Sequence, residues 1–301
     1  MKINFQTSLP IAVLTAMLCA PTPASAQTIL LSSGNFVVLG QTTVTNDNTT
    51  TSSVISGNVG LSPGTSVTGF QATDGGSAVV TNGVISINNG VAAQAVADAA
   101  TAYTALAAMP TGVGDNFSAL GTETLSPGVY TSASAVLEAA STTLTLNANF
   151  QNNAVWVFQI GGALTIGGGV QIIIENPGSN PASDGVFWDV ASSVTVGLDD
   201  MILGNYLAGT GSITLGAGMT GSSRFLAHAA VSLVPAGSAL SISSTAGNGN
   251  SYDGGLKYAG PGNTNLVVIP EPAAFLWLAP LGALGFVLWR RRWSVANKMV
   301  V

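Results

Sequence analysis

The stretch Phe187-Trp-Asp-Val-Ala-Ser-Ser-Val-Thr-Val-Gly197 decides the fold, because close copies of it recur along the chain. The other copies are Val157-Phe-Gln-Ile-Gly-Gly-Ala-Leu-Thr-Ile-Gly167, Asn205-Tyr-Leu-Ala-Gly-Thr-Gly-Ser-Ile-Thr-Leu-Gly216 and Arg224-Phe-Leu-Ala-His-Ala-Ala-Val-Ser-Leu-Val234. Each copy joins a run of large apolar residues to a short segment in which apolar and hydroxyl residues alternate. Repeats of about 20 residues are typical of solenoids, whose coils stack on one another.

The alternating segment predicts the arrangement of the coils. Its central hydroxyl residue falls at Thr145, Thr165, Thr195, Thr214 and Ser232, where Thr145 belongs to a preceding half-copy, Thr143-Leu-Thr-Leu-Asn147. The steps are 18 to 20 residues, apart from one of 30 that contains the turn-rich loop 176–184. This spacing suits one coil of a parallel β-helix with three short strands and three corners. Alternation also indicates a strand with one face in the core and one in water.

A helix is expected beside the solenoid. Residues 91–109 follow Asn89-Gly90 and end at Pro110, and Ala95, Tyr103 and Leu106 recur at helical spacing. Val91 and Ala99 are expected on the same side of this helix as Ala95. The opposite side is expected to carry Gln94, Asp98 and Thr101. The runs 155–160 and 186–190 are apolar on both strand faces, so their outer face needs a cover. We therefore predict that the helix packs on this doubly apolar face.

Both ends of the chain resemble sorting signals. Lys2, an apolar run and the A-x-A site Ala24-Ser25-Ala26 predict a secretory signal over 1–26. At the other end, Pro270-Glu271-Pro272 is followed by an apolar span, 273–289, and by Arg290, Arg291 and Arg292. This order resembles the PEP-CTERM sorting signal. The resemblance implies processing by an exosortase-type enzyme; a permanent single-span membrane anchor is the alternative. The protein is then exported to the outer surface or the extracellular space.

The composition of the mature part excludes several classes of function. Between Gln27 and Ile269 only Arg224 and Lys257 are cationic, against twelve acidic residues, so a nucleic acid is not an expected partner. The single cysteine, Cys19, lies in the signal segment, which leaves no thiol chemistry. His228 is the only histidine, and no motif for a nucleophile, a metal or a cofactor accompanies it. We expect no enzymatic activity, no cofactor and no metal.

Several motifs resemble the microbial ice-binding protein family with a helix-flanked, right-handed β-solenoid. They are Gly34-Asn-Phe-Val-Val-Leu-Gly40, Gly57-Asn-Val-Gly-Leu-Ser-Pro-Gly64, Leu125-Ser-Pro-Gly-Val-Tyr130, Asn153-Ala-Val-Trp-Val-Phe-Gln-Ile160 and Val186-Phe-Trp188. The resemblance spans about residues 33–242. It implies a mainly β fold: a right-handed parallel β-helix of roughly triangular section with one long α-helix alongside. It also implies that an early coil packs beside later ones.

Ice binding is the leading functional hypothesis. Ice offers neither strong charge nor a pocket, so a binder needs a flat, rigid face of small hydroxyl and methyl groups. We predict that this face holds an ordered water layer and comprises Thr143, Thr145, Thr165, Ser193, Thr195, Ser212, Thr214 and Ser232. The Thr-Ala/Gly-x-Thr/Asn repeats of some family members are largely missing, since 198–201 and 217–220 keep only Gly218 and Thr220.

Two other functions remain open. The first is a structural or adhesive matrix protein associated with an exopolysaccharide. The second is a polysaccharide-cleaving β-helix enzyme, which clustered acids such as Asp199 and Asp200 could suggest. The expected organisation is a signal peptide over 1–26, a solenoid domain over 27–262, a linker with the Pro-Glu-Pro motif over 263–272 and a membrane-spanning sorting segment with a basic tail over 273–301.

Overall fold

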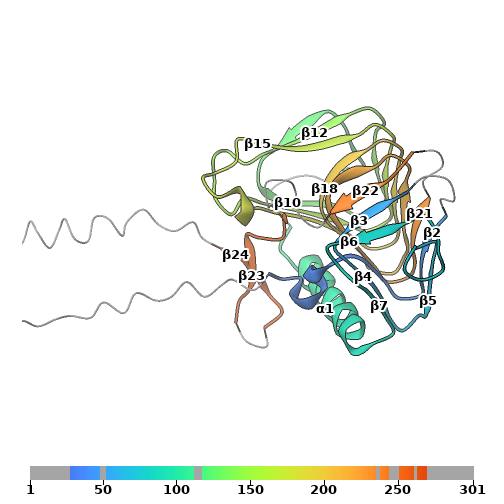
Figure 1. The fold of residues 1–301 in the computed structure, drawn as a ribbon. Helices are drawn as coiled ribbons and strands as arrows, with labels where there is room; N and C mark the ends of the chain where they lie inside the picture. The colour runs from blue at the N-terminus through green and yellow to red at the C-terminus, as the bar shows by residue number, and fades with distance from the viewer. Residues whose placement is uncertain are drawn as a thin grey trace, which may run out of the picture.

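The fold is a β-solenoid with one long helix packed along its side, as the computed structural model shows (Figure 1). The structure describes residues 28–47, 52–111, 117–234, 238–243, 251–260 and 263–269. The signal segment 1–26, the Pro-Glu-Pro motif and the segment 273–301 therefore lie outside the described residues. Within the described part, no helix is both long enough and apolar enough to cross a bilayer.

Three faces make up the solenoid. The hydroxyl sheet consists of eight parallel strands, in spatial order β5 (Ser66–Thr68), β2 (Thr43–Asn46), β21 (Val231–Val234), β19 (Ile213–Gly216), β17 (Val194–Val196), β14 (Leu164–Ile166), β11 (Val136–Glu138) and β8 (Ala119–Leu120). The helix-covered face has the order β7 (Ile85–Ile87), β4 (Asn58–Leu61), β1 (Phe36–Gly40), β20 (Thr220–Ala227), β18 (Met201–Ala208), β16 (Gly185–Val190), β13 (Val155–Ile160) and β10 (Gly128–Ser132).

The third face completes each coil. It contains β9 (Glu123–Leu125), β12 (Thr143–Asn147), β15 (Gln171–Glu175), the first residues of β18 and β20, then β22 (Ser241–Ser243), β3 (Val54–Ser56) and β6 (Val79–Thr81). The long strands β18 and β20 run from this face into the helix-covered face, and they join the two faces into one fourteen-stranded sheet. These parallel sheets, the flanking helix and the solenoid confirm the predicted fold class.

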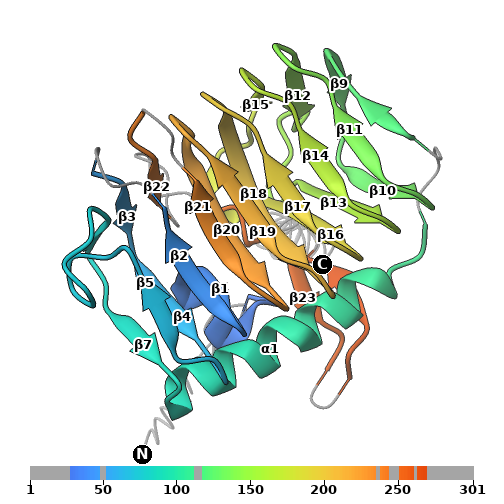
Figure 2. The same ribbon diagram turned by 90° about the vertical axis from the view of Figure 1, so that its right-hand side faces the viewer.

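The coils do not stack in chain order. Strand β1 pairs with β20, with Val38 opposite Phe225, and β2 pairs with β21, with Thr45 opposite Ser232. The first coil after the N-terminus thus lies against the last coils of the repeat. This confirms the order that the family resemblance implied (Figure 2).

Aromatic rings fill the interior of the solenoid. Equivalent inward positions carry Tyr130, Phe158, Trp188, Tyr206 and Phe225, which stack with centroid distances of 5.4, 4.0, 5.5 and 5.5 Å. Identical positions in parallel strands lie about 4.8 Å apart, which brings flat rings into contact. This column gives the coils a regular, rigid core.

The helix α1 (Gly90–Ala107) agrees closely with the predicted range. The side chain of Asn89 caps the first turn of α1, because its Oδ1 accepts a hydrogen bond from the amide of Ala92 at 2.9 Å. Ala95 and Leu106 pack on the sheet as expected, but Val91 is 62 % exposed and Asp98 only 9 % exposed. Asp98 faces inward because it accepts hydrogen bonds from the amide and hydroxyl of Ser32, a contact that helical periodicity does not reveal.

The C-terminal part of the described chain differs from the expected linker. Strand β23 (Leu256–Tyr258) pairs antiparallel with β24 (Leu266–Val268), and Leu266 is buried against the helix side of the solenoid. The expected domain boundary at residue 262 therefore falls inside this hairpin. Two short 3₁₀ turns, η1 (Leu31–Asn35) and η2 (Pro181–Ser183), complete the described elements.

Candidate functional site

The outer surface of the hydroxyl sheet is formed by strands with a simple alternation. In β14, Leu164 and Ile166 are buried while Thr165 is exposed, and β17 repeats the pattern with Val194, Thr195 and Val196. The branched apolar residues fill the interior, and this fixes the direction of the hydroxyl residue between them. Core packing thus determines which side chains reach the surface.

Six hydroxyl residues form one uninterrupted ladder on this surface. Strand register places them in the order Thr165, Thr195, Thr214, Ser232, Thr45 and Thr68, each directly opposite the next. With about 4.8 Å between parallel strands, the ladder extends over roughly 24 Å. Thr45 Oγ1 donates to Ser232 Oγ at 3.3 Å, so the hydroxyls of these two rungs are in contact.

A second column of small residues lies two positions earlier on each strand. It contains Ala163, Ser193, Ser212 and Ala230, which backbone hydrogen bonds connect from one coil to the next. Thr43 and Ser66 pair with each other and continue the column. The outward positions of the two columns carry no charged side chain in the described strands. The surface is therefore regular, uncharged and made of short side chains.

Six of the eight predicted site residues lie together on this surface. They are Thr165, Ser193, Thr195, Ser212, Thr214 and Ser232. The predicted placement was wrong for Thr143 and Thr145, which lie in β12 on the third face, where Thr145 pairs with Ile173 and Thr124. The position equivalent to Thr165 in that coil is Leu137. The step from Thr145 to Thr165 matched the repeat length by coincidence, because Thr145 belongs to the next strand of its own coil.

Sequence reasoning missed four residues of the surface: Thr43, Thr45, Ser66 and Thr68. They come from the N-terminal coils, which join the sheet by the non-sequential pairing of β2 with β21. A local signal was present, since Thr43-Val-Thr45 and Ser66-Val-Thr68 share the pattern of Ser193-Val-Thr195. Only the pairing shows that all three lie on one face.

The third face is less suited to an ordered water layer. Its outward positions include Gln171, Glu175 and Met201, which are all exposed. Asp199 is exposed at the preceding corner with φ +57°, whereas Asp200 is fully buried. Charge and bulk therefore lie on this face and its border, outside the hydroxyl sheet.

The strongly perturbed acids point away from the hydroxyl surface. Burial raises the pKa of Glu138 to about 7, although Thr142 donates a hydrogen bond to it at 2.7 Å. Burial beneath α1 raises the pKa of Asp189 to about 8, and burial raises that of Asp184 to about 6. The side chain of Glu138 points inward from β11, opposite Ile166. These groups affect stability rather than the character of the exposed sheet.

The residues grouped on the described surface offer no catalytic or metal-binding set. No group of three or more histidine, cysteine or acidic residues lies within metal-binding reach in the described part of the chain. His228 is exposed at a corner, where its Nδ1 lies 3.2 Å from the side-chain nitrogen of Gln41. The arrangement is therefore suited to binding an extended, uncharged surface.

The chain is similar to known ice-binding proteins in sequence. The Ice-binding-like family model matches residues 38–238. An ice-binding protein of Nostoc sp. (strain HG1) is 40 % identical over 222 residues, covering 73 % of this chain and 76 % of the relative. An ice-binding protein of Typhula ishikariensis is 32 % identical over 225 residues, covering 68 % of this chain and 87 % of the relative.

Solved structures support the likeness. The crystal structure of an ice-binding protein from Antarctomyces psychrotrophicus superposes with a TM-score of 0.61 at 30 % identity, covering 72 % of this chain and 97 % of the other. An ice-binding protein from an Antarctic biological consortium gives a TM-score of 0.58 at 30 % identity, covering 80 % of this chain and 96 % of the other.

Proposed function

Because the chain belongs to the ice-binding-like family, we propose that it binds ice through the outer surface of the hydroxyl sheet. The observation that carries this proposal is the ladder from Thr165 to Thr68, six hydroxyl residues in register without a charge between them. Such binding inhibits the growth and recrystallisation of ice, and no catalytic step is involved.

The surface suits ice because it is rigid and uncharged. A charged side chain keeps its own strong hydration shell and moves, which works against a water layer with ice-like order. Threonine offers a methyl and a hydroxyl group on a stiff side chain, with few rotamers to immobilise. The continuous parallel pairing of the strands holds the rungs at a regular spacing. The ice-contacting set is Thr43, Thr45, Ser66, Thr68, Thr165, Ser193, Thr195, Ser212, Thr214 and Ser232.

The location of the protein is part of the proposal. The segment 1–26 directs export, and the tail with Pro270, Glu271, Pro272, Arg290, Arg291 and Arg292 serves as a PEP-CTERM-type sorting signal read by an exosortase-type enzyme. The membrane is engaged only through 273–289. An extracellular position brings the protein into contact with ice outside the cell.

The test is ice-crystal shaping and thermal hysteresis measured on the full chain and on Thr195→Tyr. Tyrosine at the second rung of the ladder projects beyond its neighbours and separates the sheet from ice, so we expect shaping to be lost. Thr145→Tyr is the matched control, because it places the same ring on the third face. Activity that survives Thr195→Tyr but fails in Thr145→Tyr would move the site to the third face, and a full chain without any shaping would refute the function.

A groove on the third face favours a second candidate, the adhesive matrix protein. Strands β15 and β18 pair only at Gln171 and Met201 and then separate. The resulting groove, about 550 Å³, is lined by apolar residues such as Ile173 and Met201 and by hydroxyl residues such as Thr220 and Ser241, without a charged residue. An uncharged exopolysaccharide suits this lining. Retention of the full chain on a neutral polysaccharide resin, lost in Thr220→Trp, tests this role.

A further inference from the structure

The two ends of the described chain lie together on one side of the solenoid. Tyr258, in strand β23, donates its hydroxyl proton to the carbonyl of Ile29 at 2.9 Å. The amide of Ile269, the last described residue, donates a hydrogen bond to the carbonyl of Gly255 at 2.8 Å. The carbonyl of Ile269 accepts a hydrogen bond from the side-chain amide of Asn153 at 3.3 Å. Figure 1 shows both ends on the side of the molecule away from β2, β5 and β21 of the hydroxyl sheet.

The C-terminal hairpin belongs to the body of the domain. Leu256 is 1 % exposed and Leu266 9 % exposed, and both pack in the apolar cluster that includes Ile29 and Leu30. Burial of these two leucines fixes the hairpin to the body of the domain. A force applied at Ile269 therefore acts first on the packed C-terminal hairpin and not on a loose extension of the chain.

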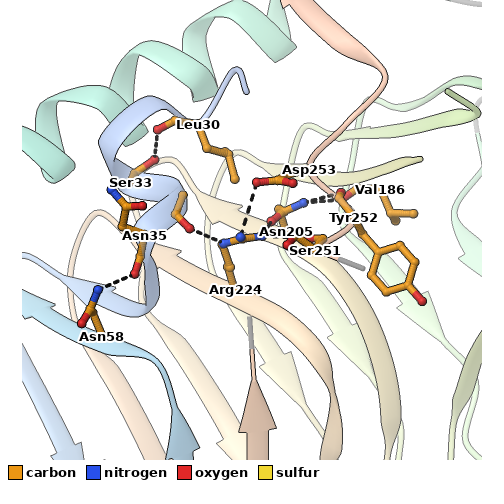
Figure 3. Close-up of polar contacts among 11 residues, drawn as sticks. Leu30, Ser33, Asn35, Asn58, Val186, Asn205, Arg224, Ser251, Tyr252 and Asp253 are labelled. Atoms are coloured by element: carbon orange, nitrogen blue, oxygen red, sulfur yellow. Dashed lines mark hydrogen bonds and ion pairs between the residues drawn. The ribbon is translucent and has the colours of Figure 1, made fainter. Parts of the chain in front are cut away.

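A buried polar cluster joins both ends to the strands (Figure 3). Arg224, which is 4 % exposed, donates from Nε to Gly34 O at 2.8 Å and from Nη1 to Asn205 Oδ1 and Ser251 O at 2.9 and 2.8 Å. Its Nη2 lies 3.3 Å from Asp253. The Asn205 side chain in turn donates to Tyr252 O at 2.7 Å. One guanidinium thus holds the N-terminal turn, the C-terminal segment and strand β18.

The same coil leads from this cluster to the hydroxyl sheet. Arg224 lies in β20, and the chain passes directly from β20 through one corner into β21, which carries Ser232 of the ladder. Strand β20 pairs with β18 over eight residue pairs and with β1, so the connection is braced from both sides. The side that carries both described chain ends is called the attachment side below. It and the hydroxyl sheet are therefore opposite surfaces of one packed unit.

We propose that the domain is an ice anchor. Its C-terminal side is joined to a larger body while the hydroxyl sheet binds ice, so the domain attaches that body to the ice surface. This inference rests on the proposed ice binding and adds the partner on the other side. With the chain ends opposite the sheet, a large attached body approaches from behind and leaves the ladder uncovered. Ile269, the last described residue, lies on this side.

The test compares two attachments of the full chain to micrometre beads. In a Cys19→Ser background, which removes the only native cysteine, a single thiol is placed by Lys257→Cys on the attachment side or by Leu137→Cys on the hydroxyl sheet beyond the end of the ladder. Both positions are exposed, and neither belongs to the proposed ice-contacting set. Beads coupled at equal density without a spacer are settled on an ice surface and washed, and the retained fraction is counted.

We expect beads coupled through Lys257→Cys to stay on ice and those coupled through Leu137→Cys to be washed off. Adding Thr195→Tyr to the first variant should release its beads as well. Equal retention from both attachments, with equal ice shaping by both uncoupled variants, would overturn the anchor geometry and leave ice binding intact. Absence of ice shaping by the uncoupled variants would instead refute the proposed function, and the anchor role with it.

Discussion

The hydroxyl sheet and the helix-covered face are built from the same coils, yet their outer surfaces differ completely. In β17 of the hydroxyl sheet the residues alternate between buried and exposed, whereas all six residues of β16 on the helix-covered face are buried. The outward residues of the covered face include Phe187 and Leu207, with Gln159 and Asp189 among them. Those of the hydroxyl sheet from β14 to β5 are short, uncharged and regular, and only beyond the ladder does β11 present a large residue, Leu137.

This difference separates two tasks of one scaffold. The covered face stabilises the fold through area and specific contacts: Gln159, for example, donates to the carbonyls of Leu106 and Met109 at the end of α1. The outward side chains of the hydroxyl sheet add little to stability because they have few partners in the described structure, whereas the inward ones belong to the core. Substitutions should therefore divide into those that change stability and those that change only the exposed surface.

The largest effect should come from the interior that both faces share. Trp188 is 1 % exposed and stacks on Phe158 at 4.0 Å and on Tyr206 at 5.5 Å. Trp188→Ala leaves a large cavity and should lower the free energy of unfolding by roughly 5 kcal/mol, measured by chemical denaturation. Thr195→Ala in the next strand of the same coil should change it by no more than about 0.5 kcal/mol. Similar losses in the two variants would contradict the division of tasks.

The Arg224 cluster should give the next largest effect. Arg224→Met removes the guanidinium, and with it the ion pair of the Asp253 carboxylate and the donor to Oδ1 of Asn205. Because Asp253 retains some exposure, we expect a loss of roughly 3 kcal/mol, at the low end for a broken buried pair. Lys257→Met, which removes an exposed cation of the same domain, is the control and should be nearly neutral. Ice shaping by the folded fraction should be unchanged in both variants.

The buried acid beneath the helix should make stability depend on pH. Asp189 has an ordinary pKa of 3.8 that burial raises to about 8 in the fold, where Gln159, Leu207 and Tyr103 surround it. The protonated form is favoured in the folded state, so its contribution is complete below pH 4 and is lost as the pH rises from about 4 to about 8. Asp189→Asn should remove this loss and raise the stability at pH 9 by several kcal/mol relative to the native chain, since the raised pKa is worth about 1.4 kcal/mol for each pH unit, with little change at pH 4.

Thermal melts of the native chain and of Asp189→Asn across this pH range provide the measurement. Glu138 and Asp184, whose pKa values are raised to about 7 and about 6, act in the same direction and keep a residual slope in the variant. Parallel plots of melting temperature against pH for the two proteins would show that ionisation of Asp189 does not destabilise the covered face. The hydroxyl sheet presents no titratable side chain among its outward positions, so ice binding by the folded protein should not follow this pH dependence.

The sequence predicts the regular parts of this molecule and fails where distant segments meet. The repeat identifies the solenoid, the covered face and Thr165, Thr195 and Thr214, because core packing imposes a local period on the chain. It misplaces Thr145, since the apolar–hydroxyl alternation is the same on two faces of the triangle. The partners of Arg224 and Asp98 come from segments far apart in the chain, and no local pattern marks them.

The smallest effect on stability should separate the hydroxyl group from the shape of the surface. Thr45 was not predicted as a site residue, and it joins the ladder through its 3.3 Å hydrogen bond to Ser232, 187 residues away. Thr45→Val keeps the methyl group and the volume but removes the hydroxyl, so the free energy of unfolding should change by less than about 0.5 kcal/mol. We expect a partial loss of thermal hysteresis, whereas Thr145→Val on the third face should leave it unchanged. Full hysteresis in Thr45→Val would mean that the ladder acts through its shape and methyl groups, and that the hydroxyls are ordinary strand residues.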